Sequence, residues 1–321
     1  MDKLYVTNKM DIYYSTGGKN LVGGGSDVWV NHWVDEIQPK LDRPSKLVIH
    51  QDNDVRKDLD EADRIHILHG YYTPNQVVLD YKDKIYSNVM HVELKKSLNA
   101  HKDLELPLLK HFNASIEYEK DILNIAKKTI WIGLYESSYH NDYDIIDIPN
   151  FYEFNEDGIT VESNRVGFCS RMETRKAPHF LNDIDSYFFT NVEHFAWWRE
   201  NLNYNFTKTK LFQFQYKNLK KFLRRDDWGI SHSAHIHEPF GYSIFQAVDY
   251  GKIPILSEDW LHEIEYPFRA STKEDFEECW KQICKLDVNQ RQDYIDYLKD
   301  KLIKFTDKKQ WVDKYLEIYN S

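Results

Sequence analysis

The sequence predicts an α/β protein built from two Rossmann-like domains, and three observations support this. Strand-like apolar runs alternate with helix-like periodic runs through most of the chain, which is the pattern of parallel sheets connected by helices. The 321 residues suffice for two domains of ordinary size, and a hydrophobic content of 41% can bury a core in each. No short repeat or low-complexity segment interrupts the alternation. We place the domain boundary near residue 150, so that residues 1–150 and 151–321 form the two domains.

In the first half, a glycine triplet precedes the first predicted helix. Gly23, Gly24 and Gly25 lead to Ser26, an N-cap residue, after which apolar residues recur at helical spacing up to Pro39. The acid-containing stretch 151–163 is the predicted connection to the second domain. Strands are predicted at residues 46–49, 65–68 and 129–134.

In the second half, apolar runs predict strands at residues 165–169, 186–190, 229–232 and 253–256. A helix is predicted at 242–250, and the tail is helical. Thr272 and Asp275 form a predicted capping box at the start of one tail helix. Apolar residues at helical spacing mark the tail helices: Phe276, Trp280 and Ile283; Ile295, Leu298, Leu302 and Phe305; Trp311, Tyr315 and Tyr319.

The most informative segment runs from residue 237 to residue 256. A Glu-Pro-Phe-Gly turn at 238–241 precedes the predicted helix. Gly241 lets backbone amides at the helix start approach a ligand closely, where unpaired N–H groups and the helix dipole favour phosphate oxygens. Glu238 and Gln246 are eight residues apart, about two helical turns, which places both on one helix face. The pattern suits a nucleotide-sugar site, and equally an ordinary turn, helix and strand unit.

This segment resembles the signature of retaining glycosyltransferases of the two-Rossmann-domain (GT-B) type. The family pattern is Glu-x-Phe-Gly, a second Glu eight residues after the first, and then Gly-x-Pro. The resemblance implies two domains facing one another across a cleft, with the acceptor bound by the first domain and the final helices packed back on it. It implies that Glu238 grips the transferred sugar. It also places Phe240, Gly241 and Tyr242 in the donor site.

Gln246 departs from the family pattern. The second Glu of the family is implied to bind the ribose hydroxyls of the donor. An amide still donates and accepts hydrogen bonds there, but it loses the charge-assisted part of the interaction. The departure leaves donor identity and affinity open.

Two cations follow the first predicted strand of the second half. Arg171 and Lys176 lie five residues apart in a loop at the carboxyl end of that strand, where ligands bind in open α/β sheets. Surface cations with no function would fit the same positions. The family carries an Arg and a Lys at this spacing, which implies that Arg171 and Lys176 neutralise the departing diphosphate and act in catalysis with Glu238.

Two features of the first half also match the family. The loop with Gly24 and Gly25 resembles the Gly-rich loop implied to lie under the transferred sugar and diphosphate, although an extra Gly17-Gly18 turn intervenes. His69 ends a predicted strand, where the family often carries a histidine that contacts the donor sugar. We therefore include His69 among the catalytic candidates. A histidine in such a place is otherwise a structural hydrogen bonder.

We expect no metal or other cofactor beyond the nucleotide-sugar donor. His232, His235 and His237 with Glu238 suggest a zinc site, but the sequence shows neither convergent geometry nor the outer hydrogen bonds that orient metal ligands. Asp-x-Asp pairs at 52 and 54, 142 and 144, and 183 and 185 would suit a metal-dependent (GT-A) transferase. Such pairs are expected by chance in a chain with 52 acids.

The composition indicates in which cellular compartment the protein resides. The three cysteines are too few and too irregularly spaced for a disulfide framework, which favours a reducing environment. No apolar run approaches the ~18 residues that span a bilayer, and the N-terminus does not resemble a signal peptide. We expect a soluble cytoplasmic protein, in the host cytoplasm if a phage encodes it. The amino-acid composition is typical of AT-rich coding DNA, which suits a phage or a low-GC bacterium.

One basic run contrasts with the formal net charge of -10. Residues 208–225 contain seven cations and no acid, which suits either a solvated helix face or a face that contacts phosphates. The seven are Lys208, Lys210, Lys217, Lys220, Lys221, Arg224 and Arg225.

The resemblance implies transfer of a sugar, with UDP as the expected nucleotide, to an acceptor hydroxyl with retention at the anomeric carbon. Relatives of this fold in T-even-like phages glycosylate hydroxymethylated bases flipped from the DNA helix. Hydroxymethylated cytosine in phage DNA is therefore the expected acceptor, and residues 208–225 the expected contact with double-stranded DNA. A cell-envelope polysaccharide or other glycan is the alternative acceptor. Gln246 keeps open a catalytically silent sugar-binding protein of the same fold.

Overall fold

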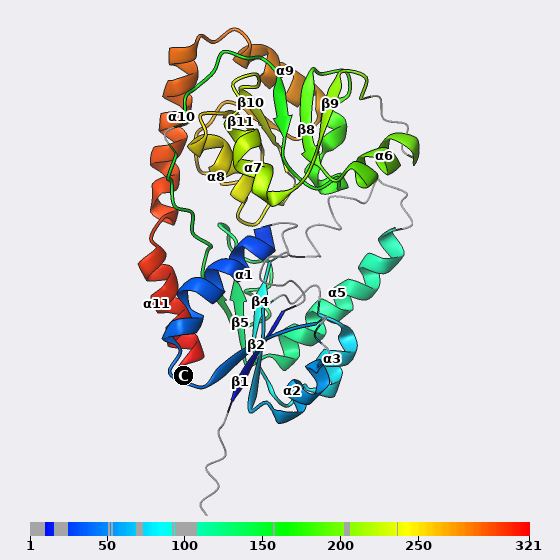
Figure 1. Cartoon of the computed structure of the whole chain (residues 1–321), viewed down its shortest axis with the longest axis vertical. Coiled ribbons are helices and arrows are strands. Elements are labelled where there is room, and N and C mark those ends of the chain that lie inside the picture. The colour runs from blue at the N-terminus through cyan, green and yellow to red at the C-terminus, as the bar shows by residue number, and fades with distance from the viewer. Residues whose placement is uncertain are drawn as a thin grey trace, which may run out of the picture. The chain divides into compact units, whose positions relative to one another are not determined.

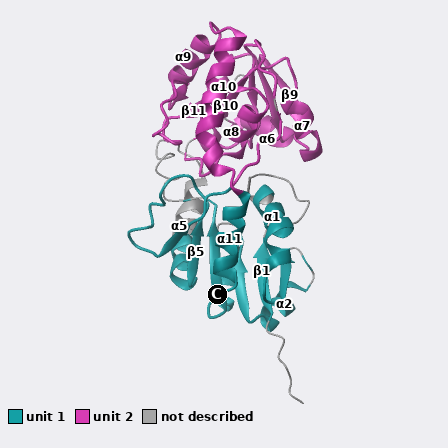
Figure 2. Ribbon diagram, turned by 90° about the vertical axis from the view of Figure 1, so that its left-hand side faces the viewer, with its two compact units in different colours: residues 1–150, 308–321 teal, residues 151–307 magenta. Residues whose placement is uncertain are grey.

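The computed structural model describes residues 10–15, 25–50, 52, 54–68, 73–91, 93, 108–156, 158–201, 206–235 and 237–321. The chain forms two compact units, shown in Figure 2: unit 1 comprises Met1–Asn150 and Lys308–Ser321, and unit 2 comprises Phe151–Asp307. Unit 1 is therefore discontinuous in sequence, because the chain passes through the whole of unit 2 before its last helix. None of the described helices is both long enough and apolar enough to cross a bilayer.

Unit 1 is built on a parallel sheet whose described strands run in the order β2-β1-β3-β4-β5-β6. Strand β1, which lies between β2 and β3, is buried along its whole length, as expected of a parallel strand covered on both faces. The strands are β1 (Asp11–Ser15), β2 (Ser45–Ile49), β3 (Arg64–Ile67), β4 (Ile85–Met90), β5 (Lys128–Trp131) and β6 (Ile145–Asp147). The helices are α1 (Gly25–Glu36), η1 (Gln38–Lys40), α2 (Val55–Glu61), α3 (Asn75–Asp80), α5 (Leu108–Ile125) and α11 (Lys308–Tyr319).

The C-terminal helix α11 packs into unit 1 through an aromatic face, and Figure 2 shows it among the unit 1 elements. Its residues Trp311, Tyr315 and Tyr319 are spaced four apart and are all buried. The Tyr315 ring lies 5.7 Å from that of Trp29, and the Tyr319 ring lies 5.1 Å from that of Tyr13 (centroid to centroid). The predicted helical spacing of these aromatics is thus explained by one continuous contact with α1 and β1.

Unit 2 contains a second parallel sheet, with its described strands in the order β12-β11-β10-β7-β8-β9, and helices flank it (Figure 1). Counted along unit 2, this is the 3-2-1-4-5-6 order of Rossmann folds, read from the other edge. The strands are β7 (Val166–Phe168), β8 (Ser186–Thr190), β9 (Thr209–Gln213), β10 (Ile230–Ser233), β11 (Ile253–Ser257) and β12 (Arg269–Ala270). The helices are η3 (Thr174–Lys176), η4 (Pro178–Leu181), α6 (Val192–Asn201), α7 (Tyr216–Leu223), α8 (Tyr242–Asp249), α9 (Lys273–Ile283), α10 (Val288–Leu302) and η5 (Ile303–Phe305).

The predicted α/β fold with two Rossmann-like halves is confirmed, and several elements agree closely. Strand β8 has the predicted bounds, and Thr272 with Asp275 forms the predicted capping box of α9. Of the terminal helices, α11 belongs to unit 1, whereas α9 and α10 belong to unit 2.

Three local predictions were wrong. Helix α1 begins within the glycine triplet at Gly25, so Ser26 is its second residue and not its N-cap. The strand predicted at 129–134 ends at Trp131, because the chain folds back over the Trp131 indole at Gly133, where a Cβ would lie 2.4 Å from the ring. Residues 208–225 do not form one helix face: Thr209–Gln213 form the edge strand β9, and α7 follows.

The segment that enters unit 2 is fixed to α8 by one buried carboxylate. Asp249 accepts hydrogen bonds from the Tyr152 hydroxyl at 2.9 Å and from the Glu156 backbone N–H at 3.0 Å. Gly158 and Gly251 then meet backbone to backbone, since a Cβ on Gly158 would lie 2.1 Å from the Tyr250 carbonyl carbon. The turn after α8 and the entering segment are therefore held together without intervening side chains.

Candidate functional site in unit 2

The sheet of unit 2 has a topological switch point between β7 and β10. These strands are neighbours, but the chain continues from β7 toward β8 and from β10 toward β11, on opposite sides of the sheet. In open α/β sheets the two connections diverge at such a point and leave a crevice outside the carboxyl ends of the strands, where ligands bind. The connections here are residues 169–177 after β7 and residues 234–241 after β10.

Four polar side chains from these two connections meet at the switch point. The Lys176 ammonium donates to Glu238 Oε2. Arg175 Nη1 and His235 Nδ1 each lie 3.6 Å from the same oxygen. Lys176 Nζ also lies 3.4 Å from His235 Nδ1. The side chains of Lys176, Arg175 and Glu238 are 8%, 12% and 14% exposed, so the cluster is largely shielded from water.

Burial and charge set the protonation of this cluster. Burial lowers the pKa of Lys176 to about 8, although the neighbouring Glu238 carboxylate opposes the change. Burial would raise the pKa of Glu238, but the Lys176 charge, the adjacent His235 side chain and the Arg175 charge hold that pKa well below its usual range. Burial, with the Lys176 charge, lowers the pKa of His235 to about 4. At neutral pH the cluster therefore contains two cations, one carboxylate and a neutral imidazole.

Arg171, the other predicted diphosphate ligand, lies apart from this cluster. Its Nε is 3.2 Å from Glu173 Oε1, and its side chain is 41% exposed. Glu173 also lies 3.3 Å from Arg175 Nε. The loop after β7 therefore supplies three cations near one another: Lys176 faces Glu238, Arg171 faces Glu173, and Arg175 lies between the two carboxylates.

The Glu-Pro-Phe-Gly turn leads directly into α8, as the sequence predicted. Gly241 is the N-cap residue with φ of +82°, and a Cβ there would lie 2.8 Å from Ile244 Cδ1. No described side chain caps the first turn of α8. The Ile244 N–H donates to the Gly241 carbonyl oxygen at 2.8 Å, and the helix N–H groups before it point toward the space where an anion can bind. Phe240 is buried and stacked on Phe245 with centroids 4.6 Å apart, which makes it a packing residue at this turn.

A second contact holds the turn that carries Glu238. His237 has a φ of +50°, and its backbone N–H donates to Asp259 Oδ2 at 3.0 Å while its Nδ1 lies 2.6 Å from the same carboxylate oxygen. The Ser257 hydroxyl donates to the other oxygen of Asp259 at 2.6 Å. Asp259 therefore connects the end of β11 to the turn and fixes the backbone next to Glu238.

Tyr242 and Gln246 lie further along α8. Burial raises the pKa of Tyr242 well above its usual range, so its phenol stays neutral. Gln246 is half-buried, and within the described part of the chain its amide makes no hydrogen bond, which leaves it free for a ligand. The match to the Gly-x-Pro part of the family pattern is looser than the sequence comparison assumed, because Lys252 and Ile253 both separate Gly251 from Pro254.

The histidines that suggested zinc have separate partners. His232 Nε2 hydrogen-bonds the Ala177 carbonyl oxygen at 2.8 Å, His235 faces Lys176, and His237 faces Asp259. Across the described residues, no three His, Cys, Asp or Glu side chains are grouped so as to hold a metal ion. This includes the Asp-x-Asp pairs at 142 and 144 and at 183 and 185.

The unit 1 candidates can be located only in part. Gly25 is the first residue of α1, whereas Gly24 and His69 lie outside the described residues. They follow β1 and β3, which are neighbours at the switch point of the unit 1 sheet.

Sequence reasoning missed two residues of the cluster. Arg175 directly precedes Lys176 and was passed over because only the Arg171 to Lys176 spacing matched the family pattern. His235 was considered only as a metal ligand. Both residues could have been found from their positions, because Arg175 lies on the connection after β7 and His235 on the connection after β10.

Comparison with known proteins places the fold. No family model matches the chain, and no curated protein matches it. Solved structures do: an α-glucosyltransferase in complex with UDP and a 13-mer DNA containing an HMU base matches with a TM-score of 0.58 and 12% identity, over 98% of this chain and 99% of that one. The T4 phage BGT in complex with UDP-glucose matches with a TM-score of 0.56 and 11% identity, over 97% and 100%.

The chain has the GT-B fold. TarM from S. aureus, solved in complex with fondaparinux, α-GlcNAc-glycerol and UDP, matches with a TM-score of 0.55 and 15% identity over 81% of this chain. This chain spans only 56% of the length of TarM. The two glucosyltransferases, by contrast, match from end to end.

Proposed function

We propose that this protein is a glycosyltransferase that uses a nucleotide-diphosphate sugar, with UDP as the nucleotide. The observation that carries the proposal is the convergence of Lys176, Arg175 and Glu238 at the switch point of the unit 2 sheet, beside the uncapped N-terminus of α8. Buried cations next to a helix N-terminus suit a diphosphate that gains charge as it departs. Glu238 is the group that grips the sugar hydroxyls, and Gln246 meets the donor ribose. The solved neighbours support this assignment, since several contain UDP or UDP-glucose.

Retention at the anomeric carbon is part of the proposal and rests on the Glu-Pro-Phe-Gly segment. No side chain need act as a nucleophile in this mechanism, because the leaving phosphate helps to take the acceptor proton. The anomeric configuration of the product, determined by NMR, tests it.

Lys176→Ala should reduce sugar transfer by about 100-fold or more, since removal of one preorganised charge-stabilising group typically has an effect of that size. Arg171→Ala should have a smaller effect, because Arg171 is more exposed and faces Glu173. The double variant should abolish transfer. The activity is measured as nucleotide release from a panel of UDP- and GDP-sugars. Each sugar is assayed with and without hydroxymethylcytosine DNA, and in the presence of EDTA or of Mn²⁺.

Thermal unfolding should show that the two single variants and the double variant all fold. Unchanged turnover in a folded double variant would remove the donor-site assignment. The metal arms are included because one neighbouring structure of T4 phage BGT holds Mn²⁺ together with UDP.

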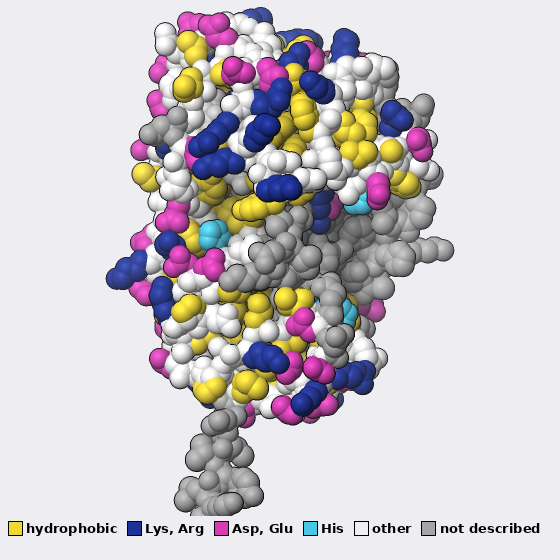
Figure 3. Space-filling model, in the orientation of Figure 1, with side chains coloured by type: hydrophobic (Ala, Val, Ile, Leu, Met, Phe, Trp, Pro, Cys, Tyr) yellow, Lys and Arg dark blue, Asp and Glu magenta, His cyan; other side chains and the backbone are white. Residues whose placement is uncertain are grey.

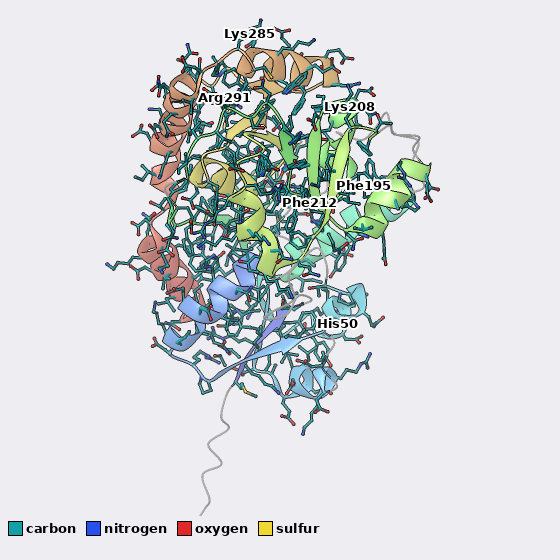
Figure 4. The ribbon with its side chains drawn as sticks, turned by 45° about the horizontal axis from the view of Figure 1, so that its top comes forward. His50, Phe195, Lys208, Phe212, Lys285 and Arg291 are labelled. Atoms are coloured by element: carbon teal, nitrogen blue, oxygen red, sulfur yellow. The ribbon has the colours of Figure 1, made fainter. Side chains whose placement is uncertain are left out.

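The acceptor we propose is hydroxymethylated cytosine in double-stranded DNA. The end-to-end match to two glucosyltransferases, one solved with DNA, supports it. The surface of unit 2 offers a second support: Figure 3 shows basic side chains gathered over α7 and β9. Phe212 lies in β9 and Lys208 directly precedes this strand; both are labelled in Figure 4.

Not all cations of residues 208–225 are available to phosphate. Lys220 and Arg224 pair with Glu156, and Arg225 pairs with Asp227. Among the described residues, Lys210 contacts the rings of Tyr187 and Phe212, with its Nζ 5.4 Å from the Phe212 centroid. Lys208, Lys217 and Lys221 have no carboxylate partner among the described residues. Lys208, Lys210, Lys217 and Lys221 are therefore the four lysines expected to contact DNA.

Replacing Lys217 and Lys221 together by Ala should weaken DNA binding and reduce the slope of log affinity against log salt by about 2, since each phosphate contact contributes roughly 0.9. A titration of hydroxymethylcytosine duplex at several salt concentrations measures both. The matched control replaces Lys281 and Lys285 of the distant α9 end, where Figure 4 labels Lys285, and should leave the slope unchanged. Absence of duplex binding at low salt would rule out a DNA acceptor.

A glycan acceptor is the second candidate, and the match to TarM favours it. Transfer to α-GlcNAc-glycerol, the compound in that complex, in the absence of transfer to DNA would select this alternative.

A further inference from the structure

Three side chains of the unit 2 cluster converge on a single oxygen. Within the described structure, Lys176 Nζ, Arg175 Nη1 and His235 Nδ1 all approach Oε2 of Glu238. Two of these three groups are cations at neutral pH, and all are largely shielded from water. Buried cations arranged around one anionic oxygen form an anion-binding site, and Glu238 supplies the anion.

The carboxylate does not satisfy this site completely. Arg175 Nη1 is buried and makes no hydrogen bond with any described group. Its distance of 3.6 Å to Glu238 allows charge attraction but is too long for a hydrogen bond. A buried guanidinium N–H without an acceptor is costly, so the site has donor capacity for an anion larger than one carboxylate oxygen.

We propose that, until the donor binds, the Glu238 carboxylate occupies the place of the donor diphosphate beside Lys176 and Arg175. In the ligand-free protein its carboxylate holds Lys176 and Arg175 together. When the donor binds, phosphate oxygens displace it from both cations, and the released carboxylate turns to the hydroxyls of the transferred sugar. This inference rests on the proposed function and adds to it a competition within the site.

The competition makes the site selective for the intact donor. UDP alone must separate Glu238 from its cations and leaves the carboxylate with no new partner. A UDP-sugar supplies that partner, because the sugar hydroxyls can donate to the displaced carboxylate. After transfer the sugar is gone, and the ion pair re-forms as UDP leaves. Glu238 is thus a specificity-determining residue that favours substrate over product.

Calorimetric titration with UDP and with UDP-glucose tests the proposal on Glu238→Gln and on the unmodified chain. The neutral amide cannot compete with phosphate, so UDP should bind about tenfold more tightly or better, given the strength of like-charge repulsion in a partly buried site. The preference for UDP-glucose over UDP should fall toward parity. Glu263→Gln, which removes an exposed carboxylate of the same unit, is the matched control for net charge and should bind UDP as the unmodified chain does.

Equal or weaker UDP binding by Glu238→Gln would overturn the inference while leaving the proposed function standing. Binding of no nucleotide by any of the three proteins would overturn both. Binding by Glu238→Gln alone would support the inference in its strongest form.

A crystal structure of the unmodified chain with UDP provides a second test that needs no variant. Lys176 Nζ should contact a phosphate oxygen, with Glu238 withdrawn from it. A structure in which UDP is bound and the Lys176 to Glu238 contact is intact would also overturn the inference.

Discussion

At the scale of single residues, the protonation of Lys176 makes the affinity for the donor depend on pH. Its pKa of about 8 means that it loses its charge a little above neutral pH. Only the charged form attracts a diphosphate, so binding favours the protonated state. UDP affinity should therefore be roughly constant below pH 8 and fall by up to about tenfold per pH unit above it. Titration calorimetry between about pH 7 and pH 9.5 measures this dependence.

Lys176→Arg is the matched control for the pH profile. The guanidinium stays protonated throughout this range, so the decline above pH 8 should disappear even if the affinity itself is lower. A profile for the unmodified chain that is flat up to pH 9.5 would contradict the assignment of Lys176 to the diphosphate.

The residues of the candidate site could be predicted only in part from the sequence. Lys176 was predicted because it lies in a loop after an apolar run readable as a strand and matches the Arg and Lys spacing of the resembled family, and Glu238 because it begins the Glu-Pro-Phe-Gly segment. Arg175 could not be separated from Arg171 in this way, since spacing along a loop does not determine which side chain turns inward. Asp259 was missed because it comes from a third connection, after β11, and acts on the His237 backbone.

At the scale of elements, Asp249 is the residue that fixes the entering segment of unit 2 to α8. Asp249→Asn keeps the size of the side chain but removes the charge and turns one acceptor into a donor facing the Glu156 N–H or the Tyr152 hydroxyl. We expect the free energy of unfolding to fall by about 1–3 kcal/mol, the cost of leaving buried polar groups unpaired. Urea denaturation measures it.

Asp293→Asn, at an exposed position on α10, is the control and should change stability by less than about 0.5 kcal/mol. Equal effects of the two substitutions would contradict the role of Asp249.

Elements were predicted best where burial gave them a uniform pattern. β8 and β11 are buried along their whole length and appeared as apolar runs. β9 did not, because it is a half-exposed edge strand inside a cationic run. The capping box of α9 was readable because its two hydrogen bonds join residues three apart, a purely local signal.

At the scale of the whole molecule, α11 ties the end of the chain to the sheet of unit 1. Tyr319 is almost fully buried against Tyr13, Trp33 and His66. Tyr319→Ala should lower the stability of unit 1 by about 3–5 kcal/mol, as for other large buried aromatic residues replaced by alanine. Hydrogen exchange of the β1 and β3 amides measures the effect within that unit.

Lys314→Ala, on the exposed face of the same helix, is the control and should leave exchange in β1 unchanged. Unaltered protection of β1 in Tyr319→Ala would show that α11 does not support the unit 1 sheet.

The fold class followed from the sequence, but the strand orders did not. Alternation of apolar runs and helical periodicity predicts parallel sheets, but it is the same for every possible order of the strands within a sheet. The two units in fact differ, because β1 is the second strand from one edge of its sheet while β7 is central in the other. Strand order depends on which face each crossover helix covers, and that choice is made by packing across the whole unit.

The discontinuity of unit 1 also affects the order in which the chain acquires its structure during synthesis. Proteins usually fold their N-terminal domain first as it leaves the ribosome. Here the aromatic face of α11 is translated after every residue of unit 2. The core of unit 1 is therefore incomplete until α11 is available, because the Trp29 and Tyr13 rings gain their contacts with Tyr315 and Tyr319 only after the whole of unit 2 has been translated.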